Sequence, residues 1–216
     1  MELGYWAIKG RAEVLRMMLA YFKLEYTEVN PTSYEDAHAK FAKYHFSFPN
    51  LPYLVDGDNH FTESTAIPLY IAQKAGATDF FGKQGIEQVY HAEVLGVERD
   101  VVDVITQIFF KDDAPEFTIS KKDFFLRKFK DLSQKLGNKQ YFFDHLTYSD
   151  FLMHFLLTSY KRVTEHLKVE DHSTEFPNLL EHTNRIGNLP GLKEFLSSEA
   201  AKSRPYMPPH MAKVKI

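Results

Sequence analysis

The sequence predicts an α/β fold for the first part of the chain and an all-α fold for the rest. Short strand-like stretches alternate with helical ones up to about residue 77, whereas later apolar residues recur at helical spacing without a convincing strand. A glycine-containing loop at 78–84 separates the two patterns. We therefore expect a first domain at 1–77, a linker at 78–84 and a helical domain at 85–216.

The first part is predicted to run βαβ and then αββα. The expected strands are 3–6, 26–29, 53–55 and 60–62, and the expected helices begin near Gly10, Tyr34 and Ser64. The sequence Asp56-Gly57-Asp58-Asn59 between the last two strands is typical of a tight hairpin turn. Ser64 suits the N-cap of the third helix, because its hydroxyl can accept a hydrogen bond from an unpaired backbone N–H.

The second part is predicted to contain helices at 86–110, 121–136 and 148–166, and a further helix from Pro177 to Gly187. The third of these helices has the clearest start. Thr147 and Asp150 form a capping box, and Leu146 and Phe151 occupy the hydrophobic staple positions around it. Pro177 suits the first turn of a helix, where its missing N–H costs no hydrogen bond.

The composition indicates a globular protein and excludes several kinds of function. Apolar residues make up 44% and charged residues 25%, which is enough to bury a core. The net charge is −3, and the interspersed signs give no basic face for nucleic acid. With no cysteine there is no disulfide, thiolate metal site or cysteine nucleophile, and the ten histidines show no metal-ligand spacing. No stretch has the pattern of a secretory signal or the length to span a bilayer, so we expect a cytoplasmic protein that does not insert into membranes.

Motifs in both parts resemble those of the cytosolic glutathione transferases. Leu3–Trp6 and Phe48–Leu54 are similar to the mu class, and Gly10–Glu13 is similar to the sigma class. Glu63–Ile67 and the Thr147 capping box follow in the order and spacing of that family. The resemblance covers almost the whole chain and leaves the choice between mu and sigma open. It implies a thioredoxin-like βαβαββα domain followed by an all-helical domain, with glutathione as co-substrate and no metal.

The resemblance implies a sulfur site near the start of the chain. A free thiol has a pKa of about 8.5, so a transferase must stabilise the glutathione thiolate at neutral pH. By resemblance, Tyr5 donates its hydroxyl hydrogen to the sulfur, and Arg11 places a positive charge nearby. Trp6, the single tryptophan, is expected to pack beside the tripeptide. The alternatives are a core or edge role for the two aromatic residues and a solvated cation for Arg11.

Recognition of the tripeptide is expected around a proline. In the family this proline is cis, so the N–H and C=O of the preceding residue, here Leu51 before Pro52, pair with an extended peptide as with an added strand. Asn50 is the adjoining polar contact. Ser64 is expected to bind the γ-glutamyl carboxylate at a helix N-terminus, and Glu63 to accept from the ligand's ammonium. An ordinary turn and a plain helix cap are the alternatives.

Three further roles come from the resemblance. Mu enzymes hold the glycine carboxylate with an Arg, a Trp and a Lys; this sequence lacks that Trp, and both Lys40 and Lys43 are candidates for the Lys. Asp100 matches the carboxylate that reaches the ligand ammonium across a dimer interface, with Asp103 as the competing alignment. Phe48 matches the mu aromatic residue that inserts between helices of the other subunit, with a core position as the alternative. The resemblance thus implies a homodimer.

The resemblance draws the electrophile pocket from both parts of the chain. Its residues are Ile8, Arg11, Arg99, Thr106, Phe110, Tyr206 and Pro209. The implied activity is conjugation of the glutathione thiolate to hydrophobic electrophiles, by direct attack on carbon without a covalent enzyme intermediate. Three alternatives stay open: a sigma-like glutathione-dependent isomerase of the prostaglandin synthase type, a glutathione peroxidase, and a transferase fold kept as a non-catalytic subunit of a larger assembly.

Overall fold

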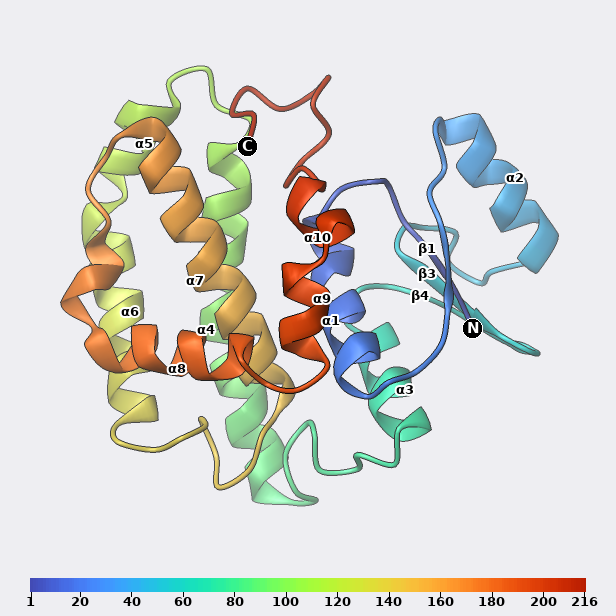
Figure 1. Cartoon of the computed structure of the whole chain (residues 1–216), viewed down its shortest axis with the longest axis horizontal. Coiled ribbons are helices and arrows are strands. Elements are labelled where there is room, and N and C mark those ends of the chain that lie inside the picture. The colour runs from blue at the N-terminus through green and yellow to red at the C-terminus, as the bar shows by residue number, and fades with distance from the viewer. The chain divides into compact units, whose positions relative to one another are not determined.

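The computed structural model describes all 216 residues and confirms a mixed sheet followed by helices (Figure 1). The sheet contains β1 (Glu2–Gly4), β2 (Thr27–Val29), β3 (Tyr53–Asp56) and β4 (Asn59–Thr62), in the order β2-β1-β3-β4. β1 and β2 are parallel, and the other two neighbouring pairs are antiparallel. All four strands form where the sequence predicts them, but β1 ends at Gly4, so Tyr5 and Trp6 follow the strand.

Residues Met1–Ala77 and Pro190–Pro208 form one compact unit. Its helices are the 3-10 helix η1 (Gly10–Ala12), α1 (Glu13–Tyr21), α2 (Tyr34–Tyr44), α3 (Ile67–Lys74), α9 (Leu192–Ser197) and α10 (Glu199–Ser203). Figure 1 shows the sheet between α2 on one side and α1 with α3 on the other. Leu3 and Leu54 of the sheet and Leu15 of α1 are fully buried in this core. α9 packs against α1, so the C-terminal segment completes the unit.

Residues Thr78–Leu189 and Pro209–Ile216 form the second compact unit, which contains no strand. Its helices are α4 (Ile86–Ile108), α5 (Ala114–Ser120), α6 (Lys122–Leu136), α7 (Tyr148–Leu167), the 3-10 helix η2 (His172–Glu175) and α8 (Pro177–Gly187). α7 packs against α4 and α8, and Phe125, Phe129, Phe151 and Tyr160 are fully buried in the core. None of the helices is both long enough and apolar enough to cross a membrane.

The predicted capping box at the start of α7 is confirmed. The buried carboxylate of Asp150 accepts hydrogen bonds from the backbone N–H of Thr147 at 2.7 Å and from its hydroxyl at 2.9 Å. It also accepts from the N–H of Phe142 at 3.0 Å and lies 2.7 Å from Nε2 of His182. These partners satisfy a carboxylate that has no access to water.

The prediction that Ser64 caps the third helix is wrong. α3 begins at Ile67, its N-cap residue is Ala66, and no side chain caps it. The carbonyl of Glu63 accepts from the N–H groups of Ala66 and Ile67 at 3.0 and 3.1 Å, so a backbone turn takes the place of the hydroxyl. Pro68 lies in the first turn, where its missing N–H is harmless.

Three short helices, α5, α9 and α10, have no counterpart among the sequence predictions. They contain 7, 6 and 5 residues, which is too few for a helical period to show. The domain bounds 1–77, 78–84 and 85–216 stay a prediction, and the compact units differ from them in grouping 190–208 with the first unit.

Candidate functional site

The register of the sheet brings three segments of the chain to one edge. Gly4 of β1 faces Tyr53 of β3, and Tyr53 faces Thr62 of β4. The chain continues past this edge from each strand, and side chains in these continuations lie near one another. The residues in question are Tyr5, Leu51–Pro52 and Glu63–Ser64.

Tyr5 is held at this edge through its backbone. Its N–H donates to the carbonyl of Val29 at 3.0 Å, and its carbonyl accepts from the side-chain amide of Asn30 at 2.9 Å. The side chain is 7% exposed, and its hydroxyl oxygen accepts from the N–H of Arg11 at 3.1 Å. Burial raises the pKa of Tyr5, while the Arg11 N–H and the charges of Arg11 and Arg16 act in the opposite direction. The hydroxyl therefore stays protonated at neutral pH, and its hydrogen is available to a ligand.

Gly10 allows the loop after β1 to fold back onto Tyr5. Its φ is +42°, and a Cβ at this position would stand 2.7 Å from the Tyr5 hydroxyl oxygen. Trp6, in the same loop, is half-buried and meets the ring of Tyr34 edge-on with 5.4 Å between centroids. The side chain of Arg11 is exposed. The segment from Tyr5 to Arg11, which ends in η1, thus carries the three residues predicted for the sulfur site.

A cluster of four charged residues lies against this loop; Glu13 and Arg16 are buried, and Glu28 and Arg204 are partly exposed. Arg16 is fully buried and donates to the carbonyls of Trp6, Ile8 and Lys9. It pairs with Glu13 at 3.1 Å and with Glu28 at 2.6 Å, and Arg204 pairs with the same two carboxylates at 3.4 and 3.0 Å. None of the four is predicted as a site residue from the sequence. The signal that could have found them is an arginine within the apolar stretch 14–19, because a buried guanidinium needs partners.

Asn50 joins the two polar segments at the edge of the sheet. Its Nδ2 donates to the Glu63 carboxylate at 3.0 Å, and its Oδ1 accepts from the N–H of Leu51 at 2.8 Å. The peptide bond between Leu51 and Pro52 is cis. Asn50 and Glu63 are exposed, and Ser64 begins the turn that leads to α3. These groups form one hydrogen-bonded polar surface that an extended polar ligand can contact.

The two candidate lysines on α2 differ in their surroundings. Lys43 donates to the hydroxyl of Tyr44 at 3.0 Å, and that hydroxyl donates to the carboxylate of Glu2 at 3.1 Å. Glu2 begins β1, whereas Tyr5 follows its other end, so Lys43 is held away from Tyr5. Lys40 lies one turn nearer to the start of α2 and is engaged in no hydrogen bond or ion pair.

The two candidate carboxylates on α4 differ in the same way. Asp100 forms an ion pair with Lys128 of α6 at 2.6 Å. Asp103 is exposed and has no such partner. Of these two candidates, Asp103 is therefore the one that is open to a ligand or to another molecule.

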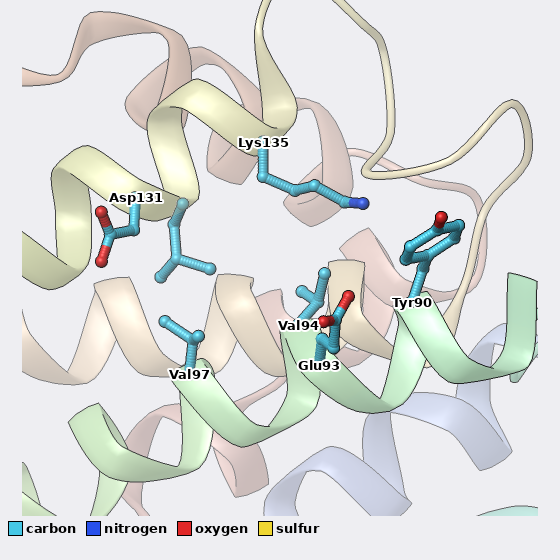
Figure 2. A pocket seen from close by; sticks show the side chains of 7 residues that line it. Tyr90, Glu93, Val94, Val97, Asp131 and Lys135 are labelled. Carbon is cyan, nitrogen blue, oxygen red and sulfur yellow. The ribbon is translucent and has the colours of Figure 1, made fainter.

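A small apolar pocket lies between α4 and α6 (Figure 2). It has a volume of about 130 Å³ and is lined by Tyr90, Glu93, Val94, Val97, Asp131, Leu132 and Lys135. Figure 2 shows Val94 and Val97 on α4 opposite Asp131 and Lys135 on α6. Nζ of Lys135 lies 5.1 Å from the ring centroid of Tyr90. The pocket thus has an apolar interior and charged groups around it.

Comparison with known proteins decides the family. Residues 1–73 match the family model described as glutathione S-transferase, N-terminal domain, and residues 99–199 match glutathione S-transferase, C-terminal domain. Glutathione S-transferase B of Cavia porcellus is 32% identical over 95% of this chain and 94% of its own. The chain belongs to the glutathione S-transferase family.

Other relatives of this transferase carry mu-class names. Glutathione S-transferase Mu 1 of Bos taurus is 33% identical over 92% of this chain and 91% of its own, and Mu 1 of Rattus norvegicus is 31% identical over 95% and 94%. Among solved structures, the glutathione S-transferase Blo t 8 has a TM-score of 0.77 at 26% identity and covers both chains fully. The Pi-class enzyme of Onchocerca volvulus has a TM-score of 0.76 at 21% identity over 96% and 97%, which shows the fold alone. The predicted family and the predicted glutathione transferase fold are confirmed.

The predicted electrophile pocket of this transferase stays a prediction. Ile8, Arg11 and Tyr206 belong to the first compact unit, and Arg99, Thr106, Phe110 and Pro209 belong to the second. Within the first unit, the carbonyl of Tyr206 accepts from the N–H of Gly10 at 3.1 Å, so the C-terminal segment runs beside the Tyr5 loop. In the second unit Arg99 is exposed and Phe110 is 41% exposed. No group of three or more His, Asp or Glu residues is arranged to hold a metal ion.

Proposed function

We propose that this transferase conjugates the glutathione thiolate to hydrophobic electrophiles, with Tyr5 as the hydrogen-bond donor to the sulfur. The observation that carries the proposal is the Tyr5 hydroxyl, whose oxygen accepts from Arg11 N–H at 3.1 Å and whose hydrogen is free for the ligand. A donor to the sulfur stabilises the thiolate relative to the thiol and so lowers the thiol pKa. Arg11 adds a positive charge on the same loop.

The chemical step needs no covalent bond to the protein. The thiol proton passes to solvent, and the sulfur electron pair forms a bond to the electrophilic carbon. The leaving group, or the opened ring oxygen, takes the electron pair of the bond that breaks. Tyr5 holds the sulfur throughout, and the roles of Ile8, Arg99, Thr106, Phe110, Tyr206 and Pro209 in binding the electrophile belong to the same proposal.

Glutathione binds in this proposal as an extended peptide at the edge of the sheet. The N–H and C=O of Leu51 pair with its backbone, and the N–H exchanges its bond to Asn50 for a bond to the ligand. Glu63 accepts from the ammonium and Ser64 binds the γ-glutamyl carboxylate. The 3.0 Å bond between Asn50 and Glu63 supports this arrangement, because it keeps the two ends of the polar surface together. Trp6 packs beside the tripeptide.

We assign the glycine carboxylate to Lys40. Lys43 already donates to Tyr44, at the end of β1 that is remote from Tyr5. Lys40 lies nearer to the start of α2 and has no competing partner. A single lysine in place of the Arg, Trp and Lys of the mu class makes a weaker hold on this carboxylate.

We further propose a homodimer in which Phe48 of one copy enters the pocket between α4 and α6 of the other. Phe48 is 74% exposed, and the hydroxyl of Thr62 donates to its carbonyl at 2.7 Å, which fixes its backbone. An apolar cavity of about 150 Å³ holds a benzene ring. The pocket of about 130 Å³ is therefore close to the size of one aromatic ring. Asp103, rather than the ion-paired Asp100, reaches toward the ligand ammonium bound by the other copy.

A spectrophotometric assay of the purified protein with glutathione and a panel of electrophiles tests the proposed activity. Glutathione consumption matched by conjugate formation supports it. Retention on immobilised glutathione without turnover of any electrophile contradicts it and favours a non-catalytic subunit. Turnover without net loss of glutathione favours the isomerase, and reduction of peroxides in place of conjugation favours the peroxidase. We also propose a cytoplasmic location, where a reducing environment keeps the thiol of glutathione available.

A further inference from the structure

We propose that Arg204, in the C-terminal segment of the first compact unit, is a positioning residue for Tyr5. The inference rests on the proposed role of Tyr5 as donor to the glutathione sulfur. Arg204 does not contact Tyr5. It acts through the ion-pair cluster that it forms with Glu13, Arg16 and Glu28, and this cluster holds the loop between Tyr5 and Arg11.

The first link runs from Arg16 to the loop. The guanidinium of Arg16 donates to the carbonyls of Ile8 at 2.8 Å, Lys9 at 3.3 Å and Trp6 at 3.4 Å. These carbonyls belong to the loop that leads from Tyr5 to Arg11, whose N–H bonds the Tyr5 hydroxyl. The guanidinium carbon also lies 6.0 Å from the Tyr5 ring centroid. The position of Arg16 therefore sets the shape of the loop and the place of the hydroxyl.

The second link runs from Arg204 to Arg16 through two shared carboxylates. Oε2 of Glu13 lies 3.1 Å from Arg16 and 3.4 Å from Arg204. Glu28 binds Arg16 through Oε1 at 2.6 Å and Arg204 through Oε2 at 3.0 Å. Both carboxylates thus compensate the charge of the fully buried Arg16 guanidinium, which needs such partners away from water. Without Arg204, Oε2 of Glu28 loses its ion pair and Glu13 keeps only Arg16 and, at 3.9 Å, Lys9, so both carboxylates are held by fewer contacts.

Two further routes lead from the same segment toward Tyr5, one through the backbone of the loop and one through Asn30. The carbonyls of Pro205 and Tyr206 accept from the N–H groups of Lys9 and Gly10 at 2.8 and 3.1 Å. The side-chain amide of Asn30 lies 2.9 Å from the Tyr5 carbonyl and 3.2 Å from Glu28. The carboxylate that Arg204 holds is thus bonded to the amide that holds the Tyr5 backbone. Movement of the Glu28 carboxylate is therefore transmitted to Tyr5 both through Arg16 and through Asn30.

The experiment is a double-mutant cycle on turnover at saturating glutathione, with the variants Arg204→Ala, Tyr5→Phe and their combination. We expect Arg204→Ala to lower kcat about tenfold, since misplacing a reacting group by about 1 Å can cost up to about a hundredfold. The KM for glutathione should stay within about twofold. In the Tyr5→Phe background the same change should have almost no effect, because the hydroxyl that Arg204 positions is already gone.

Two matched variants separate positioning from general stability. Arg204→Lys restores the charge and should recover at least a third of the lost turnover. Lys74→Ala removes an exposed ion pair with Asp56 in the same compact unit, at the other end of the sheet, and should leave kcat unchanged. If circular dichroism shows that Arg204→Ala does not fold, Arg204→Gln takes its place in the cycle with the same expectation.

The outcomes are distinct. An equal loss in both backgrounds, or no loss in Arg204→Ala, overturns the role of Arg204 while the proposed function stands. A rise in KM with unchanged kcat also overturns it, since the cluster would then act on binding. Parent-like turnover of Tyr5→Phe overturns the role of Tyr5 and that of Arg204 together.

Discussion

At the scale of single residues, the hydroxyl of Tyr5 is the group on which the proposed chemistry depends. Tyr5→Phe removes this donor and keeps the buried ring, so the fold and most glutathione binding should persist while conjugation slows. Loss of one donor to a stabilised anion typically costs about a hundredfold to a thousandfold in turnover. The kcat at neutral pH and saturating glutathione measures the effect.

Tyr70→Phe is the matched control for this prediction. It removes a hydroxyl that donates to Asp56 at 2.7 Å, away from the proposed site, and should leave kcat unchanged. Conjugation by Tyr5→Phe at the rate of the parent would exclude Tyr5 as the donor.

The part of the candidate site that lies in local sequence motifs can be predicted from the sequence. The part that depends on contacts between distant residues cannot. Tyr5, Leu51 and Glu63 stand next to recognisable strand ends and turns, so their common edge follows from the strand order. The bond from Arg11 N–H to the Tyr5 hydroxyl depends on the loop between them, which no periodicity describes. Arg204 pairs with residues almost the whole chain away, and such a pair leaves no local pattern.

At the scale of elements, the direction of α2 relative to β1 distinguishes its two lysines. Lys40→Ala should raise the KM for glutathione up to about fivefold, because an exposed ion pair is worth at most about 1 kcal/mol. The kcat should stay unchanged, since Lys40 would contact the glycine carboxylate equally in the ground state and in the transition state. Lys43→Ala should change KM by less than twofold, as its ammonium is engaged by Tyr44.

Steady-state kinetics of the two variants under one set of conditions give the comparison. A larger rise in KM for Lys43→Ala than for Lys40→Ala would contradict the assignment. That result would mean that Lys43 leaves Tyr44 when glutathione binds.

The elements that the sequence predicts well are those with a long period or a local end signal. α4, α6 and α7 are 23, 15 and 20 residues long, and α7 also begins at a capping box. The start of α3 is mispredicted because a backbone turn competes with the side chain of Ser64, and a sequence does not show which of the two prevails.

At the scale of the whole molecule, the exposed ring of Phe48 and the pocket between α4 and α6 predict self-association. Phe48→Ser should yield monomers at low concentration, because removing a buried aromatic ring typically costs about 3–5 kcal/mol and the new hydroxyl finds no partner. Val97→Trp should have the same effect from the other side of the contact by filling the pocket. Sedimentation velocity from micromolar to nanomolar concentration measures both.

Ile119→Ser is the control, since this exposed apolar residue lies on α5 and outside the pocket. It should sediment like the parent. A Phe48→Ser protein that remains dimeric at nanomolar concentration would remove Phe48 from the interface.

The grouping of residues 190–208 with the first compact unit has a consequence for biosynthesis. Ribosomes add about 5–20 residues per second, so on the order of ten seconds pass between the synthesis of residues 1–77 and that of α9, which packs against α1. α9 fits closely there, since a Cβ on Gly191 would stand 2.8 Å from the carbonyl of Ala20. We therefore expect a protease to cut residues 1–77 in ribosome-bound chains that are stalled before residue 190, and to leave the same residues intact in the released protein. Equal resistance of the stalled and the released chains would show that residues 1–77 fold without residues 190–208. The loop around Tyr5 is translated well before residues 190–208, and on this view it reaches its final structure only after them.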